Sequence, residues 1–332
     1  YSKQVQLAFR KASVVGAVTN SDYFGEIANM GDSVKIIKEP EITVKAYARG
    51  TTIQPQDLDD EDFSLTIDKA NYFAFKVDDI EEAHSHVNFQ DLASDRAAYR
   101  LADQFDQDVL GYLSGFKQSA LHGASDTVNA TVNGSVAVST AATNELLATM
   151  LVDANDFNGG TAGNSIVAVP RAGGDGLNTT TAKASPLSII ARMSRKLDQQ
   201  NVDTSGRWLV IDPVFAELLQ DEDSRLMNAD FGGAGLQNGL ILNNVHGFKV
   251  YMSNNLPAVG NGATGATATG STHYGVIVGG HSSAVATADS INKTETYRDP
   301  DSFADIVRGM HMYGRKILRP EALSRAFYVS GY

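Results

Sequence analysis

Apolar side chains alternate with polar ones in three short runs between residues 41 and 77, which is the period of a strand with one buried face. The stretch between the first two runs contains Gly50, Pro55 and several acidic residues, which predicts a loop or the tip of a hairpin. The pattern therefore predicts an extended β-ribbon. Its apolar positions are Ile42, Val44 and Ala46, then Phe63, Leu65 and Ile67, then Phe73, Phe75 and Val77.

This ribbon is too thin to be stable by itself. A two-stranded ribbon is marginal in water, and this one would expose apolar side chains and strand edges. We therefore expect it to lie on another surface, and a neighbouring copy of the same chain is the simplest candidate. Arginines near the C-terminus are expected to form salt bridges between copies. The predicted subunit contacts are Arg49, Ile53, Phe63, Leu65, Ile67, Phe73, Phe75, Arg308, Arg315 and Arg319.

A long amphipathic helix is predicted in the string DLASDRAAYRLADQFDQDVLGYLSGF. Its apolar residues recur at every fourth position, which places them on one face. Asp91 or Ser94 is expected to cap its start, and Gly115 to end it. Roughly 25 residues make a rod of about 37 Å. The residues of the apolar face are Ala97, Leu101, Phe105, Val109 and Leu113, flanked by Ala98, Ala102 and Leu110.

The rest of the chain mixes helices and strands without a repeating β-α-β order, which indicates an α+β fold. Helices are predicted at NELLATMLVDAND, at SPLSIIARMSRKLDQQN with Ser185 as N-cap, and at PVFAELLQD. Strands are predicted at GRWLVIDP, VHGFKVYMSNNLP, HYGVIVGG and AFYVSG, and a strand or helix at FADIVRGMHMYGRKIL. Low-complexity stretches at 119–141, 158–185 and 258–272 are expected to be exposed loops or short edge strands.

Composition narrows the possible functions. The chain has 332 residues, a formal net charge of -12 and no cysteine, which excludes disulfides, thiolate zinc sites and cysteine nucleophiles. A pI near 5.0 argues against a dedicated nucleic-acid binder, although cations near both ends leave weak contact with DNA open. No window approaches the ~20 apolar residues of a membrane span, so we expect a soluble intracellular protein without a membrane partner.

Four motifs resemble catalytic or ligand sites but lack the necessary context. Residues 260–265 match a dinucleotide fingerprint, but no helix follows them. Residues 280–284 are a near miss to a serine nucleophile elbow, and residues 153–159 resemble a calcium loop with an aromatic residue at a ligand position. His84 and His86 have no third metal ligand. We predict no enzyme, no cofactor and no metal site.

Longer strings carry a resemblance. EITVKAYARGTTI and LTIDKANYFAFKVDDIEEA precede the long helix, and GRWLVIDPVFAELL, GFKVYMSNNLP and YRDPDSFADIVRGMHMYGRKILRPEAL follow it. In this order, from about residue 35 to the end, the strings resemble the extended loop, axial segments and peripheral segments of tailed-phage major capsid proteins of the Hong Kong 97 type.

The resemblance implies an α+β, HK97-like capsid fold. Its parts are expected to be an N-terminal arm at 1–38, an extended β-hairpin loop at 39–78, a peripheral domain with a spine helix at 79–118 and 290–326, and an axial domain with low-complexity loops or an insertion at 119–289.

The resemblance also implies a coat protein that assembles as hexamers and pentamers into an icosahedral head around double-stranded DNA. Assembly would occur in the host bacterial cytoplasm, with scaffolding, portal and cement or decoration proteins as partners. Some members of the family join subunits through a lysine of the extended loop. Residues 49–62 contain no lysine, which favours non-covalent contacts.

Three alternatives stay open. An encapsulin-like nanocompartment shares the fold but encloses enzymes, and gene neighbourhood separates the two. A surface-layer or filament protein fits the acidic, cysteine-free composition, and electron microscopy of the assembled product separates it from a shell. A serine hydrolase would need the serine of residues 280–284 as nucleophile, together with His246, His273 or His311.

Overall fold

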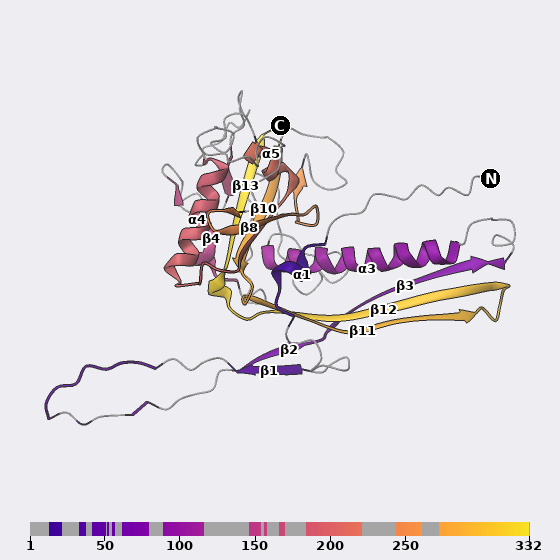
Figure 1. The fold of residues 1–332 in the computed structure, drawn as a ribbon, viewed down its shortest axis with the longest axis horizontal. Helices are drawn as coiled ribbons and strands as arrows, with labels where there is room; N and C mark the ends of the chain where they lie inside the picture. Colours follow the sequence, from indigo (N-terminus) through magenta and orange to yellow (C-terminus); the bar gives the residue numbers. More distant parts are fainter. Residues whose placement is uncertain are drawn as a thin grey trace.

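The computed structural model describes residues 13–21, 33–37, 42–50, 52, 55–56, 62–79, 89–115, 146–153, 156–157, 166–169, 184–220, 244–260 and 272–331. They form a compact part on an eight-stranded sheet and an elongated part on a three-stranded sheet, from which a two-stranded ribbon projects (Figure 1). This is the α+β architecture predicted from the sequence. The helices are α1 (Val15–Val18), α3 (Phe89–Ser114), α4 (Pro186–Gln199) and α5 (Pro213–Gln220), with short 3-10 helices at Ala148–Met150 and Pro320–Ala322.

The eight-stranded sheet is mixed. Its order is β4-β13-β10-β6-β8-β7, with β5 also beside β13 and β9 beside β10. β10 runs antiparallel to β13 and β6, whereas β6 is parallel to β8 and β13 is parallel to β4. The strands are β4 (Leu151–Val152), β5 (Ile166–Ala168), β6 (Arg207–Ile211), β7 (Asn244–Val245), β8 (Phe248–Met252), β9 (Val259–Gly260), β10 (Thr272–His281) and β13 (Leu323–Gly331).

Both faces of this sheet are covered, so β6 is buried along its whole length. Trp208 and Val210 enter the core shared with α1 and the C-terminal end of α3. Leu209 and Ile211 enter the core beneath α4 and α5. A strand covered on both faces has a continuous apolar sequence, and the predicted buried strand GRWLVIDP is confirmed.

The elongated sheet has the order β11-β12-β3, with all strands antiparallel. The strands are β3 (Lys69–Asp78), β11 (Val285–Arg298) and β12 (Ala304–Ile317). α3 lies along one face of this sheet, and its C-terminal end enters the core of the compact part (Figure 1). The predicted helix is confirmed, but it begins at Phe89, so Asp91 and Ser94 lie inside it and not at its cap. Gly115 ends it with a φ of 62°.

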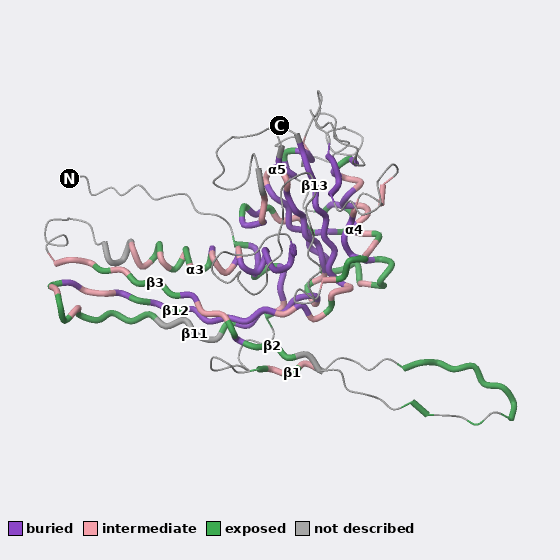
Figure 2. Tube along the Cα trace, turned by 180° about the vertical axis from the view of Figure 1, so that it is seen from behind, coloured by how far each residue is buried: buried purple, intermediate pink, exposed green. Residues whose placement is uncertain are grey.

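The ribbon consists of β1 (Ser33–Ile37) and β2 (Asp62–Thr66), paired antiparallel from Ser33 opposite Thr66 to Ile37 opposite Asp62. Leu65 and Ile67 pack on Ala286, Ala288 and Met312 of the long sheet. The other end of the ribbon leads away from the body (Figures 1 and 2).

Two predictions about the ribbon were wrong. The described residues 42–50 contain no strand, and β1, at residues assigned to the arm, is the strand that pairs with β2. The run containing Phe73 and Phe75 is not ribbon, because β3 pairs with β12 from Asp78 to Lys69. Alternation alone does not identify the partner strand, which is what decides membership of a sheet.

Among the other elements, α4 with Ser185 as N-cap, α5, β8, β10 and β13 are confirmed, and residues 304–317 form a strand. The helix predicted at residues 144–156 is wrong in its described part. Leu151 and Val152 instead pair in parallel with Arg325 and Ala326 of β13, and tertiary pairing outweighs local helix propensity. No helix in the described residues is long and apolar enough to cross a membrane.

Candidate functional site

Three aspartates of α3 are buried: Asp103, Asp106 and Asp108. A buried carboxylate is costly unless hydrogen bonds or an opposite charge compensate for its lost hydration. Asp103 accepts hydrogen bonds within the helix, from Arg100 and Gln107. The other two reach distant parts of the chain, and they fix how α3 is held.

Asp108 joins α3 to β12. Its carboxylate lies 3.0 Å from the guanidinium of Arg315, and the two side chains are only 1% and 2% exposed. The hydroxyl of Tyr313 donates to the same carboxylate at 3.0 Å, and the guanidinium lies 4.4 Å from the centre of the Tyr112 ring. Burial, and then the negative charge of Asp108, raise the pKa of Tyr313, so its hydroxyl stays a donor. We call Asp108, Arg315 and Tyr313 the helix–sheet latch.

Asp106 joins α3 to the N-terminal segment. Its Oδ1 accepts from the backbone N–H groups of Val14 and Val15 at 2.9 and 3.0 Å, which satisfies donors at the start of α1. Its Oδ2 accepts from the side-chain amide of Asn255 at 2.8 Å. One carboxylate therefore holds three segments of the chain together.

Replacing Asp106 with alanine leaves these buried donors without an acceptor. We expect Asp106→Ala to lower the free energy of unfolding by about 3 kcal/mol, because each buried unsatisfied group costs about 1–3 kcal/mol. Urea unfolding followed by circular dichroism measures the change. Asp106→Asn keeps one acceptor oxygen and should lose less stability. Equal losses in the two variants would contradict the assigned role.

Large apolar side chains are exposed at several places, which include the outer face of the long sheet and the segment after β1. On the face of the long sheet away from α3, Tyr72 is 81% exposed and Tyr297 is 42% exposed. In the segment that follows β1 in sequence, Ile42, Val44 and Tyr47 are 70%, 94% and 70% exposed (Figure 2). Side chains of this size in contact with water indicate surfaces that another molecule covers.

The predicted contact residues fall into four groups. Arg49, Arg308 and Arg319 are exposed. Leu65 and Ile67 are buried in their own chain at 0% and 1% exposure, and Arg315 is in the latch. Phe73 and Phe75 stack on each other in β3, and Phe73 lines a cavity below α3. Ile53 and the side chain of Phe63 lie outside the described residues.

The C-terminal cations do not form one basic face. Arg315 and Arg325 are buried, and burial lowers the pKa of Arg325 to about 10. Arg308 is exposed but lies 2.8 Å from Glu295. Lys3, Arg10 and Lys11, the cations near the N-terminus, lie outside the described residues.

Where the structure describes them, the sequence motifs considered as catalytic do not have the structural surroundings that catalysis would require. Residues 280–284 form the end of β10 and the turn into β11, so the strand–turn–helix geometry of a nucleophile elbow is missing. Nε2 of His273 lies 2.9 Å from Asp212, where the hydroxyl of Tyr328 also donates, and all three side chains are buried. Within the described residues, no three acidic or histidine side chains gather as metal ligands. His84 and His86, and most of residues 260–265, lie outside them.

Asp106 and Asp108 were not predicted as functional residues, although the sequence around Asp106 contains a signal. Ala98, Ala102 and Leu110 recur at every fourth position beside the main apolar face, and Asp106 occupies the one remaining place in that row. A carboxylate within an apolar row predicts a buried acid with a partner elsewhere.

Solved structures of phage capsids share this architecture. The chain is similar over 99% of its length to a structure from Mycobacterium phage Che8, with 24% identity, a TM-score of 0.68 and 95% of that chain covered. It is similar over 99% of its length to the capsid of the cyanophage P-SCSP1u, with 19% identity, a TM-score of 0.65 and 91% of that chain covered. It is also similar over 100% of its length to the capsid of Ralstonia phage GP4, with 12% identity, a TM-score of 0.62 and 94% of that chain covered. The fold is thus that of phage capsid subunits.

A family model described as phage capsid protein matches residues 60–326, so the chain belongs to the phage capsid protein family. The chain is therefore a phage capsid protein. It is a structural component of the virion and not an enzyme. No curated protein matches the chain.

Proposed function

We propose that this chain contains the parts of a Hong Kong 97 type subunit, with residue boundaries that differ slightly from those expected from the sequence. α3 is the spine helix, and with β3, β11 and β12 it forms the peripheral domain. The eight-stranded sheet with α4 and α5 is the axial domain. The extended loop runs from β1 to β2, at residues 33–66 and not 39–78. The length of α3, 26 residues, and its position along the long sheet support this assignment.

The extended loop clasps a neighbouring subunit within hexamers and pentamers. The observation that carries this proposal is the exposure of Ile42 and Val44, at 70% and 94%, which are alternate residues on one side of the loop. Burial of apolar area stabilises association by about 25 cal/mol per Å². Each such contact is modest, but in a closed shell every copy makes it at the same time, which multiplies its effect. Arg49 in the loop and Arg308 and Arg319 near the C-terminus are exposed cations that can contribute to the same interfaces.

A charge on the loop tests this contact. We expect Val44→Asp to abolish shells under conditions in which the unchanged chain forms them, because the contact would bury an unpaired carboxylate. Negative-stain electron microscopy and sedimentation measure shell yield. The melting temperature of the unassembled subunit should stay the same, since Val44 is 94% exposed there.

Thr43→Asp is the matched control, because it adds the same charge on the adjacent exposed residue and keeps Val44. Successive side chains of an extended segment point to opposite sides, so this variant should still form shells. Normal shells from Val44→Asp would refute the proposed contact.

Scaffolding, portal and cement or decoration proteins complete the proposed set of partners. The contact with packaged duplex DNA is weak and non-specific. The formal charge of -12 and the burial of Arg315 and Arg325 support a weak contact, because tight binding to phosphates requires accessible Lys and Arg. The absence of lysine from residues 49–62 supports non-covalent contacts through that part of the loop.

A further inference from the structure

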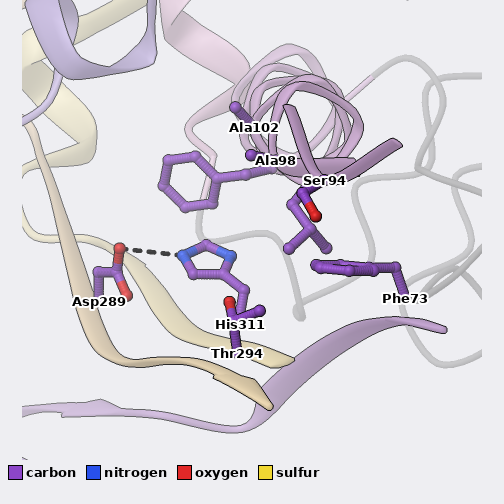
Figure 3. Close-up of a pocket in the computed structure, with 9 residues that line it drawn as sticks. Phe73, Ser94, Ala98, Ala102, Asp289, Thr294 and His311 are labelled. Carbon is purple, nitrogen blue, oxygen red and sulfur yellow. Dashed lines mark ion pairs between the residues drawn. The ribbon is translucent and has the colours of Figure 1, made fainter. Parts of the chain in front are cut away.

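A cavity of about 350 Å³ lies between α3 and the long sheet (Figure 3). Its walls are mostly apolar, with Phe73 from β3 and Leu101 and Phe105 from α3. Ala98 and Ala102 leave the space open on the helix side, because their side chains are too short to fill it. This volume is at the lower end of the range of small-molecule sites, which hold roughly 300–1,000 Å³.

His311 forms one polar end of the cavity. Its Nε2 lies 2.9 Å from Oδ2 of Asp289, and because a carboxylate only accepts, the imidazole donates there. The ring of Phe105 contacts the imidazole edge-on at 5.6 Å, and the ring of Tyr313 stacks on it at 5.3 Å. The imidazole is therefore held in one orientation.

The described part of the chain offers no partner to the other nitrogen of His311. Nδ1 is buried and makes no hydrogen bond within the described residues, while His311 as a whole is 8% exposed. In Figure 3 this nitrogen faces the space between Ser94 and Phe73. With the proton on Nε2, Nδ1 of the neutral ring is an acceptor. A buried acceptor aimed into a cavity lacks only a donor.

The other polar groups around the cavity determine whether a charged or a neutral hydrogen-bond donor binds best there. Asp289 lies at the open side of the cavity, with 39% of its side chain exposed, next to a β-bulge in β11. Ser94 and Thr294 contribute hydroxyls, and no lysine or arginine is among the described residues that line the cavity. A carboxylate with no cation beside it repels anions and attracts cations. The faces of Phe73 and Phe105 also suit a cationic or aromatic group.

We propose that this cavity is a binding site for a small organic amine, with one apolar ring and a protonated amino group. The ring lies between Phe73, Leu101 and Phe105. The ammonium group donates to Nδ1 of His311. The carboxylate of Asp289, which binds Nε2 on the other side of the imidazole, attracts the positive charge without touching it. Such a ligand contacts α3 and the sheet together, and because it binds only the folded layer, it stabilises that layer by mass action. This site goes beyond the role of the chain as a capsid subunit and does not depend on the loop contact.

Four compounds of nearly equal shape separate the contributions of the ring, the hydrogen-bond donor and the charge to binding. They are benzylamine, benzyl alcohol, toluene and benzoate. In calorimetric titration of the purified protein, we expect one saturable site per chain for benzylamine. Benzyl alcohol should bind about tenfold more weakly, since it keeps a donor but lacks the charge. Toluene should bind more weakly still, and benzoate should not bind. Equal or tighter binding of toluene, benzyl alcohol or benzoate would overturn the proposal, as would the absence of a saturable site.

Two variants test whether benzylamine binds in this cavity. Ala102→Leu fills the cavity from an exposed helix position, so the protein should keep its melting temperature and lose benzylamine binding by about tenfold or more. Asp289→Asn should bring the affinities of benzylamine and benzyl alcohol together and leave toluene unchanged. Asp301→Asn, at an exposed acid outside the cavity, is the control for net charge and should change nothing. Unaltered benzylamine affinity in Ala102→Leu or Asp289→Asn would put the binding elsewhere and refute the assignment.

Discussion

Gly314→Ala is expected to separate the ribbon from the long sheet and to prevent shell formation. A Cβ atom at residue 314 would lie 2.2 Å from the backbone oxygen of Thr66 and 3.3 Å from the Cα of Ile67. Both neighbours are backbone atoms, so no rotamer change relieves the overlap. β2 must move away, and the burial of Leu65 and Ile67 is then lost.

The expected loss of stability is about 3–6 kcal/mol, because Leu65 and Ile67 both become exposed and each exposed aliphatic side chain costs about 1.5–3 kcal/mol. Urea unfolding measures this loss, and electron microscopy measures shells. Gly16→Ala in α1 is the control, since a Cβ there meets nothing within 4 Å. It should be neutral or stabilise slightly. Shells of normal yield and stability from Gly314→Ala would show that β2 does not need this close approach.

Asp108→Ala is the second large expected effect. Arg315 would keep its charge at 2% side-chain exposure and lose its carboxylate partner. Removing one member of a buried ion pair costs about 3–5 kcal/mol, and the hydroxyl of Tyr313 loses its acceptor as well. We expect a matching fall in the free energy of unfolding by urea, together with faster amide hydrogen exchange in α3.

Two comparisons make this test specific. Glu295→Ala breaks an ion pair with Arg308 in which both side chains are 57% exposed, and it should cost less than about 1 kcal/mol. The double variant Asp108→Leu with Arg315→Met replaces the buried pair with apolar groups, and it should recover most of the lost stability. If Asp108→Ala costs no more than Glu295→Ala, the latch does not hold the helix.

The elements predicted correctly are those whose own sequence determines them. The four-residue period of α3, the Ser185–Pro186 start of α4 and the apolar run of β6 each identify one element without knowledge of its neighbours. β11 was missed for the opposite reason. It is an edge strand whose residues 294–298 are all exposed, so its sequence carries little apolar periodicity.

The residues of the site were harder to predict because their partners lie far away in the sequence. Asp108 and Arg315 are 207 residues apart, and Asp106 and Val14 are 92 residues apart. An acid within a helix indicates a solvated position unless its partner is known. For residues 42–46, alternation indicated a strand, yet the described residues of this chain provide no strand beside them. A strand pattern with no partner strand among the described residues is consistent with the proposed contact between subunits.

Because the latch fixes α3 near one end, a small rotation there produces a larger displacement at the other end of the helix. Its C-terminal end is fixed by Asp106 to the N-terminal segment and Asn255 and by Asp108 to β12, while Phe89 lies about 28 Å from Asp108 along the helix axis. A rotation of about 5° at the latch carries that far end through about 2.5 Å, which is close to half a helical turn. Small angular adjustments near the core of one subunit therefore become displacements large enough to change which atoms meet at its far end.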